Sequence, residues 1–77
     1  MPSKQERVLA HLKANMAITP LEALEHYSSM RLGAIIFELR KKYIIETEMV
    51  DGLDRFGNNV RYAKYHFRGE IEQNSDL

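Results

Sequence analysis

The sequence contains no cysteine and no long apolar run. Without cysteine the chain has neither disulfide bonds nor thiolate ligands for zinc, so its fold depends on its hydrophobic core alone. No apolar run approaches the roughly 18 residues of a membrane-spanning helix, and Met1 to Lys4 do not lead into the apolar stretch of a signal peptide. The three histidines do not recur at metal-ligand spacing. We therefore expect a cytoplasmic protein with no membrane contact and no cofactor, metal or small-molecule ligand.

The length of 77 residues is enough for one small domain, and 44% apolar with 29% charged residues is the balance of a globular protein. Below about 80 residues a hydrophobic core is thin, which favours self-association as a homodimer. The stretch from Gly69 to Leu77 is polar, acidic and without periodicity. We therefore assign residues 1–68 to the domain and predict a disordered acidic tail over residues 69–77.

The charges are unevenly distributed, although eleven basic and eleven acidic residues give a formal net charge of zero. Residues 1–68 carry a net charge of +3, and residues 55–68 contain four basic residues and no acidic one. Local fields decide contact with a polyanion more than the total charge does. The alternative interpretation is a solvated surface of mixed sign.

The first helix is predicted from a capping box. In the motif Ser3-x-x-Glu6 the hydroxyl and the carboxylate each satisfy an unpaired backbone N–H at the helix start. We place this helix at about Lys4 to Ala14. The next segment, Met16 to Ile18, is too short for a helix and is predicted to be extended.

The second helix has the strongest local signal in the chain. Thr19 would cap it, Pro20 would occupy the first helical position, where a missing N–H costs nothing, and Glu22 would close the capping box. We expect this helix to end near Tyr27, because the following serines are typical of another helix start.

The third helix is predicted from its periodicity. Apolar residues recur at the i, i+3, i+4 and i+7 positions of one helix face, namely Leu32, Ile35, Ile36 and Leu39. We take Ser29 as the cap and place the end near Lys42 or Tyr43. At 100° per residue, the opposite face carries Met30, Ala34, Phe37 and Lys41.

From Ile44 onward the pattern alternates with a period of two, as in β-strands. Two alternating segments are separated by residues that tolerate positive φ, including Asp51-Gly52 and Gly57-Asn58-Asn59. We predict a two-stranded β-hairpin with a protruding tip at about Arg55 to Asn59.

The predicted order of elements is that of an α+β, mainly α, winged helix-turn-helix: three helices, the last two joined by a tight turn, and then a hairpin wing. Three segments carry a resemblance over residues 5–67: Ile18-Thr19-Pro20-Leu21-Glu22-Ala23-Leu24, then Arg31-Leu32 with Ile35 and Leu39-Arg40, and Val60-Arg61-Tyr62-Ala63-Lys64-Tyr65. They resemble the small winged helix-turn-helix domains of bacteriophage and prophage proteins. The resemblance implies binding to double-stranded DNA.

In such a domain the second of the paired helices lies in the major groove. The candidate contacts there are Ser28, Ser29, Met30, Arg31, Ala34, Phe37, Glu38 and Lys41. Arg31 would form a bidentate contact with a guanine, the three apolar side chains would meet thymine methyl groups, and the serines would hold a phosphate. The alternative for Arg31 is an ion pair with Glu38 or Glu25.

The hairpin tip offers a second set of contacts, to phosphates or to a neighbouring minor groove. Its candidates are Arg55, Asn58, Asn59 and Arg61. The alternative is an ordinary turn whose charges serve solubility.

Phe37 and Met30 leave one rival function open. An exposed aromatic beside a methionine is also typical of a protein-binding patch, so the domain would then inhibit or recruit a host or replication protein. Catalysis is not expected: Glu46 and Glu48 share a strand face, but no further catalytic group accompanies them. We expect a sequence-specific DNA-binding protein, either a transcriptional regulator or an excisionase-like architectural factor, acting as a dimer or as adjacent copies.

Overall fold

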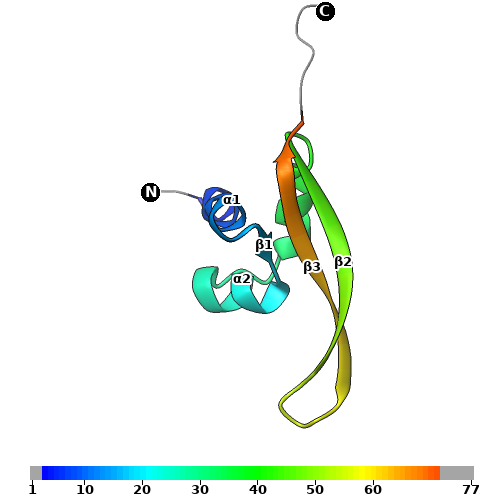
Figure 1. Cartoon of the computed structure of the whole chain (residues 1–77). Coiled ribbons are helices and arrows are strands. Elements are labelled where there is room, and N and C mark those ends of the chain that lie inside the picture. The colour runs from blue at the N-terminus through cyan, green and yellow to red at the C-terminus, as the bar shows by residue number, and fades with distance from the viewer. Residues whose placement is uncertain (1–2, 72–77) are drawn as a thin grey trace, which may run out of the picture.

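The computed structural model describes residues 3–71, which form three helices and one antiparallel sheet (Figure 1). In chain order the elements are α1 (Lys4–Asn15), β1 (Ala17–Ile18), α2 (Pro20–Tyr27), α3 (Leu32–Leu39), β2 (Tyr43–Leu53) and β3 (Asn59–Glu70). The order of the strands in the sheet is β1-β3-β2. The winged helix architecture is confirmed. Within residues 3–71, no helix is long and apolar enough to cross a membrane.

Local capping fixes the starts of the first two helices, as predicted. The Ser3 side chain accepts a hydrogen bond of 3.2 Å from the backbone N–H of Glu6. At α2 the capping box is complete: the Thr19 hydroxyl accepts from the Glu22 N–H at 3.2 Å, and the Glu22 carboxylate accepts from the Thr19 N–H at 2.9 Å. Both helices thus begin where short-range chemistry alone places them.

The sheet has three strands, so the prediction of a two-stranded hairpin was wrong. The extended segment Ala17–Ile18 pairs with β3, Ile18 lying opposite Tyr65, and the Phe67 N–H donates to the Met16 carbonyl at 2.9 Å. Ile18 is fully buried, which holds this short strand against the core. The prediction failed because the partner of β1 is far away in the sequence, and no local pattern reveals that pairing.

The third helix is shorter than predicted, because the residues on either side of it form turns. Ser28 ends α2 in the left-handed conformation (φ 53°), and the Ser29 N–H bonds to the Ala23 carbonyl at 3.1 Å. The chain therefore re-enters a helix only at Leu32, with Arg31 as N-cap and no side-chain cap. Beyond Leu39 the helix gives way to a turn, and β2 begins at Tyr43.

The core lies between the helices and one face of the sheet. Its buried apolar residues are Val8, Leu12, Ile18, Ala23, Leu32, Ile36, Leu39, Ile45 and Phe67. Leu32, Ile36 and Leu39 belong to the predicted stripe of the third helix, and Ile35 is half-buried beside them. Burial of this stripe fixes the rotation of α3 and turns its other face outward.

The hairpin extends far beyond the helices (Figure 1). Pairing of β2 with β3 continues six residues past the last pair of β1, from Thr47–Tyr65 to Leu53–Asn59. At ~3.3 Å per residue this adds about 20 Å of two-stranded ribbon. We call this ribbon, with the turn over residues 54–58, the wing.

The predicted domain boundary at residue 68 falls inside β3. Gly69 and Glu70 pair with the start of β2, and the Ile71 N–H donates to the Lys42 carbonyl at 2.9 Å. The tail prediction was therefore wrong for residues 69–70, because they complete a sheet ladder whose partner strand begins at Tyr43. The remainder of the predicted tail, residues 72–77, lies outside the described residues.

Candidate nucleic-acid interface

The outward side of α3 and of the turn before it is exposed. We call the side chains of Met30, Arg31, Ala34 and Phe37 the recognition face. All four are exposed, Met30 at 86% and Phe37 at 66%. The periodicity argument is therefore right about the geometry, because the opposite side of the helix is occupied by the core.

A shallow depression brings six of the predicted residues together beside the N-terminus of α1. These are Ser28, Ser29, Met30, Arg31, Ala34 and Glu38. Besides Ile35 of α3, two residues of α1 complete the lining, Lys4 and Gln5, and Lys4 Nζ donates to the Ser28 carbonyl at 3.1 Å. Sequence reasoning missed both, because only the packing of α1 against α3 brings them to this surface.

Three of the predicted residues of α3 and of the turns on either side of it, Ser29, Glu38 and Lys41, have side chains already engaged within the protein. Ser29 is only 4% exposed, and its hydroxyl accepts from the Arg31 N–H at 3.4 Å, so it belongs to the turn. Lys41 forms an ion pair of 3.0 Å with Glu38 and lies 5.7 Å from the centre of the Phe37 ring. Both ends of that ion pair are about half exposed or more, so a phosphate can compete for the lysine.

Arg31 is exposed and has no ion-pair partner among residues 3–71. The alternative pairing with Glu38 or Glu25 is not present, since Glu38 bonds to Lys41 instead. By contrast Arg40, in the same basic cluster as Lys41, donates to the Ile45 carbonyl at 3.0 Å and to the Thr47 hydroxyl. Arg40 therefore fastens the end of α3 to β2, and Arg31 remains available.

The turn of the wing is built around the Asp54 carboxylate. It accepts from the backbone N–H groups of Phe56 at 2.8 Å and Asn58 at 2.9 Å, and from the Asn58 side chain at 3.4 Å. These hydrogen bonds hold the pKa of Asp54 below its usual range, and the bond from the Asn58 backbone has the largest effect. Gly57 supplies the positive φ of 83° that closes the turn. Asn58, predicted to contact DNA, thus has a structural role as well.

The other predicted wing residues differ in what they contact. Arg61 lies opposite Asp51 in the ladder, with Nε 3.4 Å from the carboxylate, and both side chains are largely exposed. Asn59 is the first residue of β3. Arg55 is exposed and has no ion-pair partner in the part of the chain that the structure describes, so it is an available cation at the turn of the wing.

An apolar cleft between α2 and the wing was not foreseen from the sequence. Its lining includes Leu21 and Leu24 of α2, Met30, and Val60 and Tyr62 of the wing. Leu21 is 63% exposed and Leu24 46%. The i, i+3 spacing of the two leucines, which puts both on one face of α2, is the sequence signal for this cleft. Because Met30 lines both this cleft and the depression beside α1, the two form one continuous surface.

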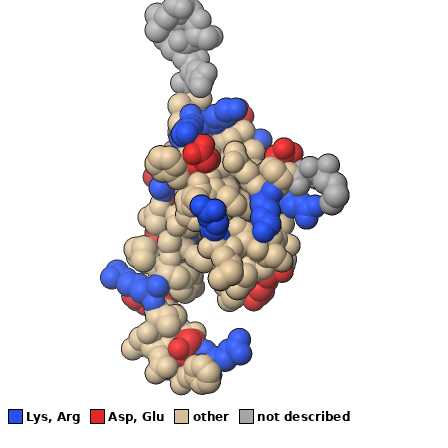
Figure 2. Space-filling view, turned by 180° about the vertical axis from the view of Figure 1, so that it is seen from behind, with Lys and Arg blue, Asp and Glu red and all other residues tan. Residues whose placement is uncertain are grey.

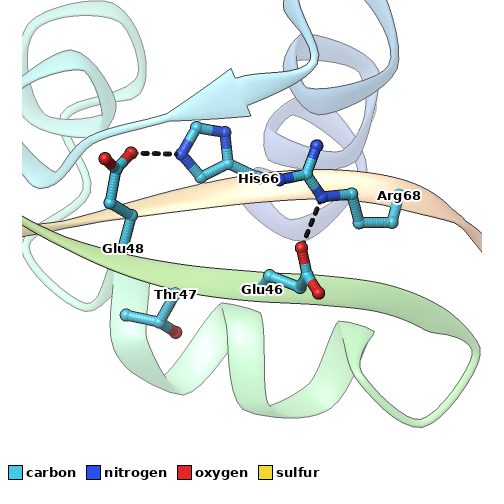
Figure 3. A pocket seen from close by; sticks show the side chains of 5 residues that line it. All are labelled: Glu46, Thr47, Glu48, His66 and Arg68. Atoms are coloured by element: carbon cyan, nitrogen blue, oxygen red, sulfur yellow. Dashed lines mark hydrogen bonds and ion pairs between the residues drawn. The ribbon is translucent and has the colours of Figure 1, made fainter.

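The carboxylates of Glu46 and Glu48 lie on the outer face of the sheet, each beside a basic side chain of β3 (Figure 3). Oε1 of Glu48 lies 2.8 Å from Nε2 of His66, and Glu46 forms an ion pair with Arg68. Thr47 points to the other face of the strand. A cross-strand hydrogen bond between Glu48 and His66 and a cross-strand ion pair between Glu46 and Arg68 account for this cluster.

Figure 2 shows the face on which α3 lies in front of the sheet. Separate Lys and Arg side chains lie across the body without merging into one patch, and further basic side chains stand on the wing below. Such a spread of single charges suits point contacts along a polyanion more than one concentrated anion site.

A family model described as "Winged helix-turn-helix domain" matches residues 3–69. No curated protein and no solved structure shows a significant match to the chain. The matched range runs from the cap of α1 almost to the end of β3, so it includes the recognition face and the whole wing.

Proposed function

Because the chain belongs to the winged helix-turn-helix domain family, we propose that it binds double-stranded DNA with α3 in the major groove. One observation carries the proposal: the recognition face is fully outward while the opposite side of α3 is core. A helix held in this way presents its side chains to a groove without any rearrangement of the domain.

The residues of the recognition face have distinct roles in this proposal. Arg31, which is exposed and forms no ion pair among residues 3–71, reads a guanine edge through its two-pronged guanidinium. Met30, Ala34 and Phe37 meet thymine methyl groups or sugar surface. Lys4, at the rim of the same depression, binds a backbone phosphate beside the groove.

The wing contributes positioning contacts to the backbone. Arg55 carries the larger share, because Arg61 already has Asp51 at 3.4 Å. Asn59 lies at the start of β3 beside the turn and is available for a further polar contact. These contacts set the register of the domain on DNA and carry no sequence information themselves.

The biological role within this proposal is that of a phage or prophage transcriptional regulator or an excisionase-like architectural factor. The three motifs around Thr19-Pro20, Arg31-Leu32 and Arg61-Tyr62 support it by their resemblance to such domains. A domain of this size covers few base pairs, so useful specificity requires a dimer or adjacent copies on DNA.

The decisive experiment is a fluorescence anisotropy titration of a labelled random-sequence duplex at low ionic strength. We expect binding whose logarithm falls linearly with the logarithm of salt concentration, since phosphate contacts release counterions. Absence of binding at low salt would overturn the proposal.

One observation favours a second function, the binding of another protein. The apolar cleft of Leu21, Leu24, Met30, Val60 and Tyr62 offers a surface to an apolar side chain more readily than to a phosphate. This function predicts no binding to the random duplex at low salt, so the same titration separates the two.

A further inference from the structure

The tip of the wing carries a bare aromatic ring. Phe56 is 81% exposed, and Leu53, at the last ladder pair, is 69% exposed. The ring does not line the apolar cleft against α2, although its neighbours Asp54 and Arg55 do. An aromatic side chain that no part of its own domain covers is a candidate contact with a partner.

The turn holds this ring in a defined position. The Phe56 N–H is bound to the Asp54 carboxylate, the Asp54 N–H donates to the Asn58 carbonyl at 2.9 Å, and the Gly57 N–H donates to the Asp54 carbonyl at 3.0 Å. Four residues are thereby tied to one another at the end of a paired ribbon. A ring on such a turn loses little further backbone freedom when it binds.

The length of the wing matches the spacing of the DNA grooves. The ribbon extends about 20 Å beyond β1 at ~3.3 Å per residue. One turn of B-DNA measures ~34 Å, so a major groove and the adjacent minor groove are about half that distance apart. A ribbon of this length is therefore long enough for its tip to reach the minor groove beside a major groove that holds α3.

The charges around the tip suit that groove. Arg55 precedes Phe56 and has no ion-pair partner among the described residues, and residues 55–68 contain no acid. The negative charge of Asp54 is directed at the N–H groups of its own turn. The ring is therefore flanked by a cation that a phosphate can bind.

We propose that Phe56 is a wedge that enters the minor groove and inserts between two base pairs, bending the duplex. Apolar wedges of this kind unstack a base step and kink DNA by ~20–90° toward the major groove. This inference rests on the proposed DNA binding. It adds a contact site, Phe56 in the minor groove, and an effect on the DNA, the bending of the duplex. It would make the protein an architectural factor, not a reader of sequence alone.

The test measures bending separately from binding. A duplex selected by the wild-type protein from a random library is labelled with a donor and an acceptor at its two ends, and a second copy carries 2-aminopurine at successive positions. We expect the wild-type protein to raise energy transfer and to brighten 2-aminopurine at one step. Phe56→Ala should lose both signals, and Phe56→Leu should keep part of the bend because leucine is also an apolar wedge.

The controls separate the possible failures. Ile44→Ala removes an exposed apolar side chain at the opposite end of the hairpin and should leave both signals unchanged. Circular dichroism should show the same folded spectrum for the Phe56 variants, whose ring contributes nothing to the core. The salt slope of binding should be equal for wild type and Phe56→Ala, because no charge is removed.

Two results would overturn the wedge. One is an unchanged energy-transfer signal with Phe56→Ala bound to the duplex. The other is a sedimentation experiment in which the wild-type protein is a dimer and Phe56→Ala is a monomer, while the variant still bends the duplex. The ring would then contact a second copy of the protein and not the DNA. Failure of the wild-type protein to bind any duplex would instead reject the proposed DNA binding, so the two failures are distinguishable.

Discussion

Arg31 occupies a position in which several constraints meet. As N-cap of α3 it has a backbone fixed by the turn, its N–H is bound to the Ser29 hydroxyl, and its guanidinium is exposed without a carboxylate partner among residues 3–71. A fixed backbone with a free side-chain head suits recognition, because only the rotamers of the side chain, and not the backbone, remain to be ordered on binding.

Replacing Arg31 by alanine should weaken binding to a selected site by ~1–3 kcal/mol, because the bidentate contact with a guanine is lost. Anisotropy titrations of the selected duplex and of one with that base pair changed measure the effect. Arg68→Ala is the matched control, since Arg68 lies on the outer face of the sheet, paired with Glu46. Equal affinity of a folded Arg31→Ala for the selected duplex would remove Arg31 from the site.

At the scale of elements, features set by neighbouring residues could be predicted from the sequence, and features set by distant ones could not. The starts of α1 and α2 follow from capping at Ser3 and Thr19, and the outward side of α3 follows from its apolar period. The third strand depends on Ile18 meeting Tyr65. No short-range pattern encodes that contact.

The residues of the candidate site differ in the same way: some could be predicted from their neighbours in the sequence, and others could not. Phe37 could be placed on a surface by periodicity, Arg31 by the motif to which it belongs, and Arg55 by its position in a polar turn. Lys4 could not, because it reaches the site only through helix packing. The surrounding turn residues predict only a turn at Phe56, but a large aromatic side chain in a solvent-exposed turn is itself a signal of function.

The turn of the wing is the element whose stability depends most clearly on pH. The pKa of Asp54 is lower in the folded turn than in the unfolded chain, so its ionised form stabilises the turn above the unfolded pKa. This contribution is lost as the pH falls through the folded pKa. In an NMR titration, the Asp54 carboxyl carbon should titrate below the usual aspartate range.

Asp54→Ala should open the turn at neutral pH as well. The amides of Phe56 and Asn58 would then lose their acceptor and exchange faster with solvent, while the amides of the core strand around Phe67 keep their protection. An Asp54 midpoint at or above the usual range, together with unchanged exchange in Asp54→Ala, would contradict this account of the turn.

For the whole molecule, the fold places two chemically different surfaces side by side. The depression beside α1 carries Lys4 and Arg31, the cleft beside the wing is apolar, and Met30 lines both. A duplex lying against this surface would meet cations at the body and at Arg55, with apolar contacts between them. The zero net charge therefore does not describe the face that DNA meets.

The charges of the wing should be visible in the salt dependence of binding by the whole domain. Each phosphate contact contributes ~0.9 to the log–log slope, so removing both Arg55 and Arg61 should flatten the slope by up to about 2. Arg55→Ala alone should account for most of the change, because Arg61 is shared with Asp51. The charge-matched control is Lys13→Ala with Arg68→Ala: Lys13 lies in α1 and Arg68 near the end of β3 that is remote from the tip, so neither belongs to the wing. Equal slopes for the two double variants would mean that the wing attracts DNA only through overall charge and makes no phosphate contact of its own.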